Sequence, residues 1–134
     1  MKRKILIILA YILVLLVGMF IKKANAEAPL LTKEELYELQ LDQWVSRLID
    51  DESNGNELVV VLDTNNKYSY GCLQYQMDTW ISAAKKFGVD AEIMDCDAQV
   101  YVTKELIKDN YKNWQKWYTS VTTKTSGKPP LPVN

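Results

Sequence analysis

Apolar residues recur at helical intervals along the segment that begins near residue 33, with polar residues between them. Thr32 and Glu35 have the spacing of a capping box, in which the two residues pair through side chain and backbone at a helix start. Asn54, which glycine follows, tolerates the left-handed backbone that ends many helices. The pattern predicts a helix over residues 33–51 and places Glu52 on its last turn. The positions predicted to face inward are Leu36, Leu39, Trp44, Val45, Leu48 and Ile49.

A short β-hairpin is predicted directly after this helix. Residues 58–62 are apolar and mostly β-branched, and residues 63–67 have the composition of a turn. Residues 68–70 can return as a second short strand. We expect the hairpin to lie beside Glu52.

Helical periodicity resumes in the C-terminal half. Asp78 is expected to cap a second helix, which Gly88 closes. A third helix should begin near Asp95 or Asp97, and a short helical piece around two tryptophans should pack back on the core. The positions predicted to face inward are Trp80, Ile81, Ala84 and Phe87, then Val100, Leu106 and Ile107, and finally the region of Trp114 and Trp117. The predicted fold class is α+β and mainly α-helical, with a small hairpin after the first long helix.

The N-terminal residues have the composition of an export signal. Three basic side chains lie in the first four residues, residues 5–21 form an unbroken apolar run of 17, and residues 24–26 have the small-x-small pattern that signal peptidase accepts. Seventeen apolar residues are also at the lower limit for spanning a bilayer, so residues 1–26 are either a signal peptide or an uncleaved membrane anchor. In both cases we expect the rest of the chain to be extracytoplasmic.

Residues 27–134 suit a single domain with one core, and we expect a monomer. The domain is predicted to span residues 27–121. Residues 122–134 contain three prolines and a glycine, and are predicted to form a flexible tail with no means of burying itself.

Charge and composition exclude several functions. Residues 1–26 carry five basic side chains and no acidic one, so the other 108 residues have 11 basic and 17 acidic side chains and a net charge of about −6. Such a surface argues against nucleic-acid binding, which needs basic patches. The chain has no histidine, which removes Ser/His and Cys/His catalytic pairs and the commonest metal ligand. No metal site or cofactor is therefore expected.

Cys72 and Cys96 are the only cysteines. An even number of cysteines in an exported chain indicates a disulfide, and this one would tie the segment after the hairpin to the start of the third helix. Two buried free thiols are the alternative, because cysteine is a good small apolar residue.

Two sequence elements suggest a function. Glu52 and Ser53 begin the run Glu-Ser-Asn-Gly-Asn, and residues 68–75 read Tyr-Ser-Tyr-Gly-Cys-Leu-Gln-Tyr, with Gly71 nineteen residues after Glu52. Over about residues 33–117, the chain resembles the lysozyme-like superfamily and, within it, the soluble lytic transglycosylase (SLT) domain. The resemblance implies a lysozyme-like fold that cleaves peptidoglycan glycan strands without a cofactor. It also implies that Glu52 is the general acid and base.

The resemblance assigns supporting roles to residues around Glu52. Ser53 would hydrogen-bond near Glu52 or the substrate, Gly71 would let the backbone approach the sugar, and Gln74 would bind sugar polar groups. Tyr70 and Tyr75 would supply stacking or a hydroxyl contact. Each residue also has a structural interpretation: a helix end for Ser53, a turn for Gly71, a capping side chain for Gln74, and core packing for the tyrosines.

The Glu52 carboxyl must still be protonated near neutral pH to protonate a glycosidic oxygen. Burial would favour that state, as would the charges of Asp50 and Asp51 if they lie close enough. Neither aspartate is given a catalytic role, because adjacent helical residues do not face one another, and both are expected to form a solvated helix end.

A second carboxylate would decide between two reactions. Asp63 is the best-placed acid to lie across the cleft from Glu52, where it would act as nucleophile or activate water in a hydrolytic muramidase. Asp63 can also simply begin the turn of the hairpin, in which case the protein is a lytic transglycosylase. The alternative from another class is a non-catalytic peptidoglycan-binding or secretion-apparatus module, because fold does not fix function.

Overall fold

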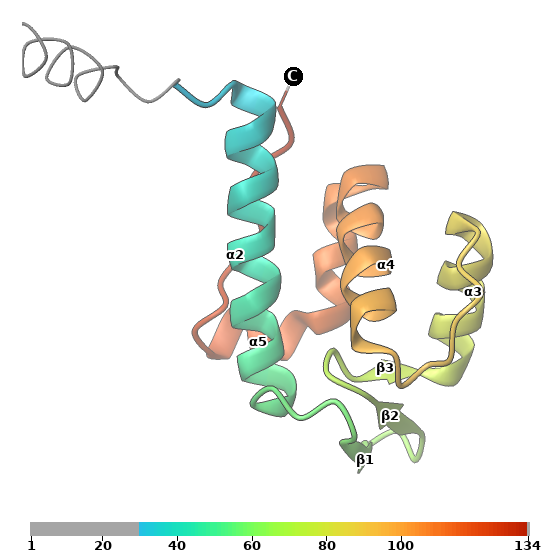
Figure 1. Ribbon diagram of the computed structural model, residues 1–134. Helices are drawn as coiled ribbons and strands as arrows, with labels where there is room; N and C mark the ends of the chain where they lie inside the picture. The colour runs from blue at the N-terminus through green and yellow to red at the C-terminus, as the bar shows by residue number, and fades with distance from the viewer. Residues whose placement is uncertain (1–29, 134) are drawn as a thin grey trace, which may run out of the picture. The chain divides into compact units, whose positions relative to one another are not determined.

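The computed structural model describes residues 30–133, which form an α+β, mainly helical unit. Within these residues there are four α-helices, one 3-10 helix and a three-stranded antiparallel sheet that follows the first long helix (Figure 1). The predicted fold class is confirmed. The predicted signal peptide or anchor, residues 1–26, lies outside the described residues. None of the helices within residues 30–133 has both the length and the apolar character needed to cross a bilayer.

Helix α2 (Lys33–Ser53) begins as predicted, and its last residue lies two beyond the predicted bound of 51, directly before the predicted stop residue Asn54. The Thr32 hydroxyl accepts a hydrogen bond from the Glu35 amide at 3.2 Å, and the Glu35 carboxylate accepts one from the Thr32 amide at 2.8 Å. Asn54 ends the helix with a left-handed backbone at φ 54°. Glu52 therefore lies on the last turn, where the sequence placed it.

The buried stripe of α2 differs from the predicted one at its N-terminal end. Leu36 and Leu39 are 45% and 44% exposed, so their predicted inward orientation is wrong. The buried positions follow spacings of four, three, one and three residues, which is one face of a helix. They are Tyr37, Leu41, Trp44, Val45 and Leu48.

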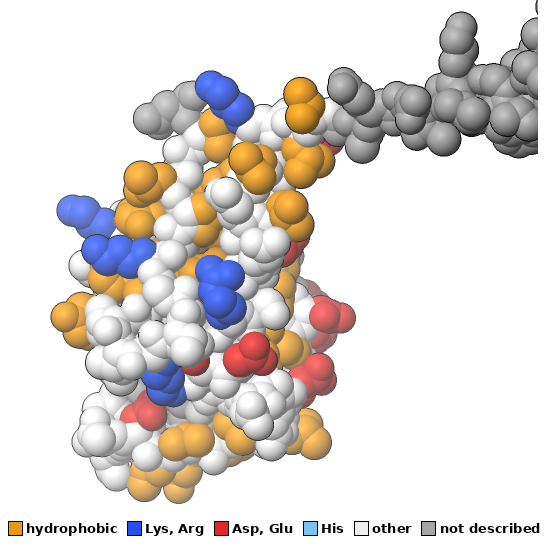
Figure 2. All heavy atoms as spheres, turned by 90° about the vertical axis from the view of Figure 1, so that its left-hand side faces the viewer, with side chains coloured by type: hydrophobic (Ala, Val, Ile, Leu, Met, Phe, Trp, Pro, Cys, Tyr) orange, Lys and Arg blue, Asp and Glu red, His pale blue; other side chains and the backbone are white. Residues whose placement is uncertain are grey.

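The predicted hairpin is formed by β1 (Val60–Leu62) and β2 (Tyr68–Tyr70). The two strands pair antiparallel, with Val60 opposite Tyr70 and Leu62 opposite Tyr68. All three residues of β1 are exposed. Figure 2 shows hydrophobic side chains at the lower end of the molecule, where Figure 1 places these strands.

A third strand, β3 (Tyr75–Gln76), was not predicted. It pairs antiparallel with β2, with Tyr75 opposite Tyr70. Two residues of positive φ, Gly71 at 74° and Gln74 at 53°, reverse the chain between the two strands. The segment after the hairpin therefore returns along the sheet before the next helix begins.

Helix α3 (Met77–Phe87) ends at Gly88, whose φ is 68°, as predicted. Asp78 does not cap it, because Asp78 lies within the first turn and pairs with Lys67 at 2.7 Å. Ile81 is 58% exposed, so its predicted burial is wrong. The buried positions of α3 are Trp80, Ala83 and Ala84.

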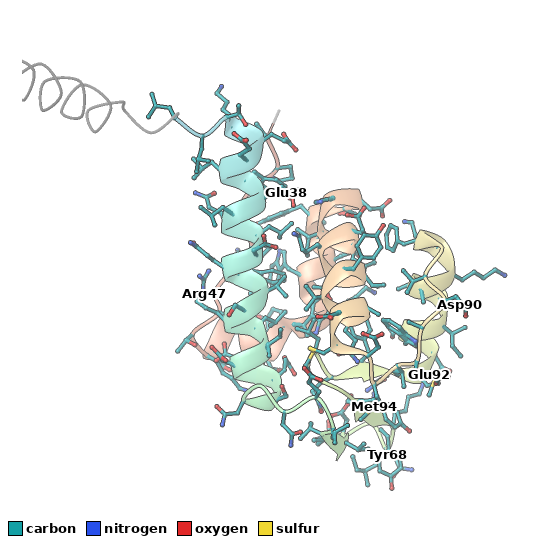
Figure 3. All side chains as sticks on the ribbon, in the orientation of Figure 1. Glu38, Arg47, Tyr68, Asp90, Glu92 and Met94 are labelled. Carbon is teal, nitrogen blue, oxygen red and sulfur yellow. A yellow bond between two sulfur atoms is a disulfide. The ribbon has the colours of Figure 1, made fainter. Side chains whose placement is uncertain are left out.

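Helix α4 (Cys96–Asp109) lies between α2 and α3 in Figure 1. It begins as predicted, because the Asp95 carboxylate accepts a hydrogen bond from the Ala98 amide at 3.0 Å. Glu38 of α2 pairs with Lys104 and Lys108 of α4 at 3.2 and 2.7 Å. Figure 3 labels Glu38 on the side of α2 that faces α4.

The chain then forms the 3-10 helix η1 (Tyr111–Trp117) and the short helix α5 (Tyr118–Thr123). Both tryptophans of η1 are buried, as predicted. The Trp117 ring packs edge-on against Trp44 and Tyr75, with centroids 6.4 and 5.5 Å away. This aromatic group joins α2, the sheet and η1 in one core.

The segment after α5 does not form the free tail that was predicted. The Trp44 indole N–H donates to the Gly127 carbonyl at 2.8 Å, and Arg47 Nε donates to the Ser126 carbonyl at 3.4 Å. Asp51 accepts from the Ser126 amide at 2.7 Å and from the Thr125 hydroxyl at 2.9 Å. The segment is held because side chains of α2 satisfy its backbone polar groups.

Cys72 and Cys96 form a disulfide, with an S–S distance of 2.01 Å and their Cα atoms 5.7 Å apart. The predicted bridge is confirmed. It joins the turn after β2 to the first residue of α4, and such a cross-link fits an extracytoplasmic protein.

Candidate functional site

A cleft of about 690 Å³ opens beside the end of α2. One wall comes from the sheet and its turns, residues 61–65 and 74–76. The other wall comes from η1 and α5, residues 115–120, and Glu52 lies between them with Lys124. The lining is mostly polar: both walls supply carboxamide and hydroxyl groups, and the two amines, of Lys116 and Lys124, come from the η1 and α5 side.

Glu52 is held in the cleft by the way α2 ends. Its helix closes at Asn54, so the side chain lies at the junction of α2 with the sheet. Burial raises the pKa of the Glu52 carboxyl, and the negative charges of Asp63 and Asp51 raise it further. Hydrogen bonding to the Ser120 side chain and the charge of Lys124 oppose this change without reversing it. The carboxyl thus keeps its proton to a higher pH than an exposed glutamate does.

Asp63 lies in the same cleft and also begins the turn of the hairpin. Its amide donates to the Lys67 carbonyl at 2.9 Å, and its carbonyl accepts from the Asn66 amide at 2.9 Å. Its carboxylate oxygen Oδ2 accepts from the Ser69 hydroxyl and from Gln76 Nε2, the latter at 2.8 Å. Asp63 therefore begins the turn of the hairpin, as one interpretation predicted, and it also lies in the cleft with Glu52.

Gln74 lines the cleft, but its amide nitrogen is directed at the backbone. Nε2 donates to the Gly71 carbonyl at 2.7 Å and to the Val59 carbonyl at 3.4 Å. These bonds close the turn from within and fix the Gln74 side chain against the sheet. Gln74 therefore caps a backbone carbonyl of the turn, as the structural interpretation predicted, and it also lines the cleft.

Gly71 and the two tyrosines have mainly structural surroundings. Gly71 does not line the cleft, and its φ of 74° is in the left-handed region that favours glycine. Tyr75 borders the cleft, but it is only 2% exposed and its hydroxyl pairs with Thr103 Oγ1 at 2.7 Å. Tyr70 packs against the core and does not line the cleft.

Ser53 also lies outside the cleft lining, and its hydroxyl donates to the Ile49 carbonyl of its own helix at 3.2 Å. The structure thus brings four of the predicted site residues to one cleft, and leaves three outside it. Those at the cleft are Glu52, Asp63, Gln74 and Tyr75, and those outside are Ser53, Tyr70 and Gly71.

Two neighbours of Glu52 were missed by the sequence analysis. The side chain of Ser120, on α5, and the charge of Lys124, just after α5, both act to lower the pKa of the Glu52 carboxyl. Lys124 is itself fixed, because its Nζ donates to the Asp51 carbonyl. A serine and a lysine about 70 residues from Glu52 in the chain belong to no motif that could have identified them.

A third residue that the sequence analysis missed is Gln99 of α4, which does not line the cleft but binds the turn beside it. It is fully buried, and Oε1 accepts from the Leu73 amide at 2.7 Å. Nε2 donates to the carbonyls of Tyr70 at 2.9 Å and Ile93 at 2.5 Å. The sequence signal that could have identified Gln99 is its position on the same helix face as Val102 and Leu106, where an apolar residue is expected. Gln99 holds both ends of the turn that carries Gly71 and Cys72.

Within the part of the chain that the structure describes, no group of three or more His, Cys, Asp or Glu side chains is placed to hold a metal ion. The cleft offers a partly buried carboxyl, a second carboxylate, two lysines and several neutral polar groups. In comparisons with known proteins, no family model, curated protein or solved structure matches the chain.

Proposed function

We propose that this protein is an exported lytic transglycosylase that cleaves the β-1,4 bond between N-acetylmuramic acid and N-acetylglucosamine in peptidoglycan. The observation that carries the proposal is the Glu52 carboxyl, which lies in an open cleft and has a pKa raised by burial. A general acid at the operating pH needs such a group. The two sequence elements around Glu52 and Gln74 support the same reaction, and the disulfide supports an extracytoplasmic location.

In the proposed reaction, the Glu52 carboxyl donates its proton to the glycosidic oxygen as the bond from that oxygen to muramyl C1 breaks. N-acetylglucosamine leaves with a new hydroxyl group. The Glu52 carboxylate then accepts the proton of the muramyl 6-hydroxyl while that oxygen bonds to C1 and closes a 1,6-anhydro ring. Glu52 ends the cycle protonated, and no water is consumed.

The surroundings of Asp63 favour this reaction over hydrolysis. A hydrolytic muramidase needs a second carboxylate free to attack C1 or to take a proton from water. Oδ2 of Asp63 already accepts hydrogen bonds from Ser69 and Gln76, so its remaining acceptor capacity is reduced. Hydrolysis stays the second candidate, because Asp63 lines the same cleft as Glu52.

The test is to incubate residues 27–134 with peptidoglycan and to identify released fragments by mass spectrometry. We expect 1,6-anhydromuramyl products from the unaltered protein and none from Glu52→Gln. Glu57→Gln, which removes an exposed acid outside the cleft, is the matched control and should keep full activity. Asp63→Asn should also keep the anhydro products.

Other outcomes would select the alternatives. Reducing-end muramyl products that disappear in Asp63→Asn would assign hydrolysis with Asp63 as the second carboxylate. Binding to peptidoglycan without any product, from both the unaltered protein and Glu52→Gln, would indicate a non-catalytic wall-binding module.

A further inference from the structure

A second hollow of about 320 Å³ adjoins the cleft. It lies between α3 and the segment formed by α4 and η1, and it shares Thr79 and Lys116 with the cleft. A chain bound beside Glu52 can therefore extend or branch into it at these two residues. Glu52 and Gln74, which support the proposed function, do not line this second hollow.

Lys116 is the unpaired cation at the junction. It is exposed, and none of the ion pairs within residues 30–133 includes it. The other charged groups of the hollow are already neutralised, because Lys86 pairs with Asp109 at 2.5 Å and Asp78 pairs with Lys67 at 2.7 Å. An anionic ligand entering the hollow thus meets one cation that has no competing carboxylate.

The rest of the hollow combines polar and apolar groups. Thr79 and Ser82 supply hydroxyls, while Ala83 and Leu106 supply apolar surface. Neutral sugars would gain little from an unpaired ammonium group, whereas a short peptide with carboxylates and methyl groups would use both kinds of surface. Residues 27–134 as a whole have a net charge of about −6, which gives no general attraction for acids, so an acidic ligand depends on a local cation such as Lys116.

We propose that this second hollow binds the acidic peptide that branches from muramic acid, and that Lys116 pairs with one of its carboxylates. This inference rests on the proposed function, since it takes the glycan in the cleft to be peptidoglycan. The protein would then distinguish glycan strands that carry peptides from strands that have lost them.

The test measures binding, so that it does not depend on turnover. Residues 27–134 with Glu52→Gln are titrated with two soluble peptidoglycan fragments of equal glycan length, one with its peptides and one from which an amidase has removed them. Lys116→Met is then compared with Lys112→Met, a matched control at an exposed lysine of the same 3-10 helix that borders neither hollow.

We expect the peptide-bearing fragment to bind more tightly, and Lys116→Met to weaken only this fragment, by about two- to fivefold, as for a partly exposed ion pair. Lys112→Met should change neither affinity, and 0.5 M salt should abolish the preference. Equal affinity for the two fragments, equal weakening of both by Lys116→Met, equal effects of the two lysine variants, or no binding of either fragment would overturn the proposal. Release of anhydro products by the unaltered protein without a peptide preference would leave the proposed function intact and remove only this inference.

Discussion

The carboxamide of Gln99 fills the space that a side chain on Gly71 would need. A Cβ atom on Gly71 would clash with Nε2 of Gln99 and lie 3.0 Å from its Oε1. The Gln99 side chain cannot easily move away from such a Cβ atom, because it is fully buried and hydrogen-bonded to three backbone groups. The requirement for glycine at this position therefore comes from packing inside the protein as well as from its positive φ.

Gly71→Ala should destabilise the fold by about 2–5 kcal/mol. A positive φ costs about 1–2 kcal/mol for a residue with a side chain, and overpacking adds about 1–3 kcal/mol. Gly55→Ala is the matched control, since Gly55 has a φ of 76° and open space around its Cβ position, and it should lose only the backbone part. Urea unfolding of both variants checks this, and equal losses would show that the Gln99 contact is unimportant.

Gln99→Leu should cost about 3 kcal/mol or more, although leucine is close in size. It would leave the Leu73 amide and the carbonyls of Tyr70 and Ile93 without their partner, at about 1–3 kcal/mol for each unsatisfied group. Amide hydrogen exchange at Leu73 should accelerate as well. Gln43→Leu, at an exposed position of α2, should change stability by no more than about 0.5 kcal/mol. Unchanged exchange at Leu73 would contradict the role given to Gln99.

Local chemistry explains why much of the fold could be predicted. The Thr32 capping box, the left-handed Asn54 and the terminal Gly88 each act within a few residues, so sequence alone determined where two helices begin or end. The hairpin was likewise recognisable from its β-branched run and turn. The position of Glu52 on the last turn of α2 also followed from the helix-stop residue Asn54.

Contacts between distant segments explain what was missed. Residues 126–127 looked incapable of burial because their partners, Trp44 and Asp51, come about 80 residues earlier. Ser120 reaches Glu52 only because α5 packs on α2. Strand β3 depends on the chain reversal between Gly71 and Gln74, in which Gln74 adopts a backbone unusual for a residue with a side chain.

Reduction of the disulfide should lower the free energy of unfolding by about 3 kcal/mol. Cys72 and Cys96 close a loop of about 25 residues, and opening it increases the entropy of the unfolded chain. Urea unfolding with and without a reductant measures the difference. A variant with both cysteines replaced by alanine should be insensitive to the reductant, and an unaltered midpoint in the native protein would refute the estimate.

Asp51→Asn should destabilise the protein at neutral pH, with a loss that shrinks as the pH falls below about 4. Burial by itself would raise the pKa of Asp51, but hydrogen bonds from Ser126 and Thr125 and the charge of Lys124 outweigh it and lower the pKa. A carboxyl whose pKa is lower in the folded state stabilises the fold above its unfolded pKa of 3.8, and this contribution disappears as the folded pKa is passed. Urea unfolding of the unaltered protein and Asp51→Asn between pH 3 and 8 measures this loss, with Asp50→Asn, at the exposed neighbour, as the matched control.

The adjacent Glu52 should show the opposite pH dependence. Its pKa is raised in the folded state by burial, so the unfolded chain releases the proton first as the pH rises. Stability contributed by protonated Glu52 is therefore complete below the unfolded pKa of 4.5 and is lost as the pH rises through the folded value. Glu52→Gln cannot ionise and avoids this loss.

Glu52→Gln should thus match the unaltered protein in stability near pH 3.5 and become progressively more stable than it above pH 4.5, until the difference levels off once Glu52 is fully ionised in the folded state. Urea unfolding of both proteins across pH 3 to 8 measures this, with Glu57→Gln as the control at an exposed acid. A stability difference that stays constant with pH would show that the folded protein does not hold the Glu52 proton, and would remove the main support for Glu52 as a general acid. A difference that grows as expected, together with loss of anhydro products in the same variant, would show that the group that destabilises the fold at neutral pH is the one that performs the chemistry.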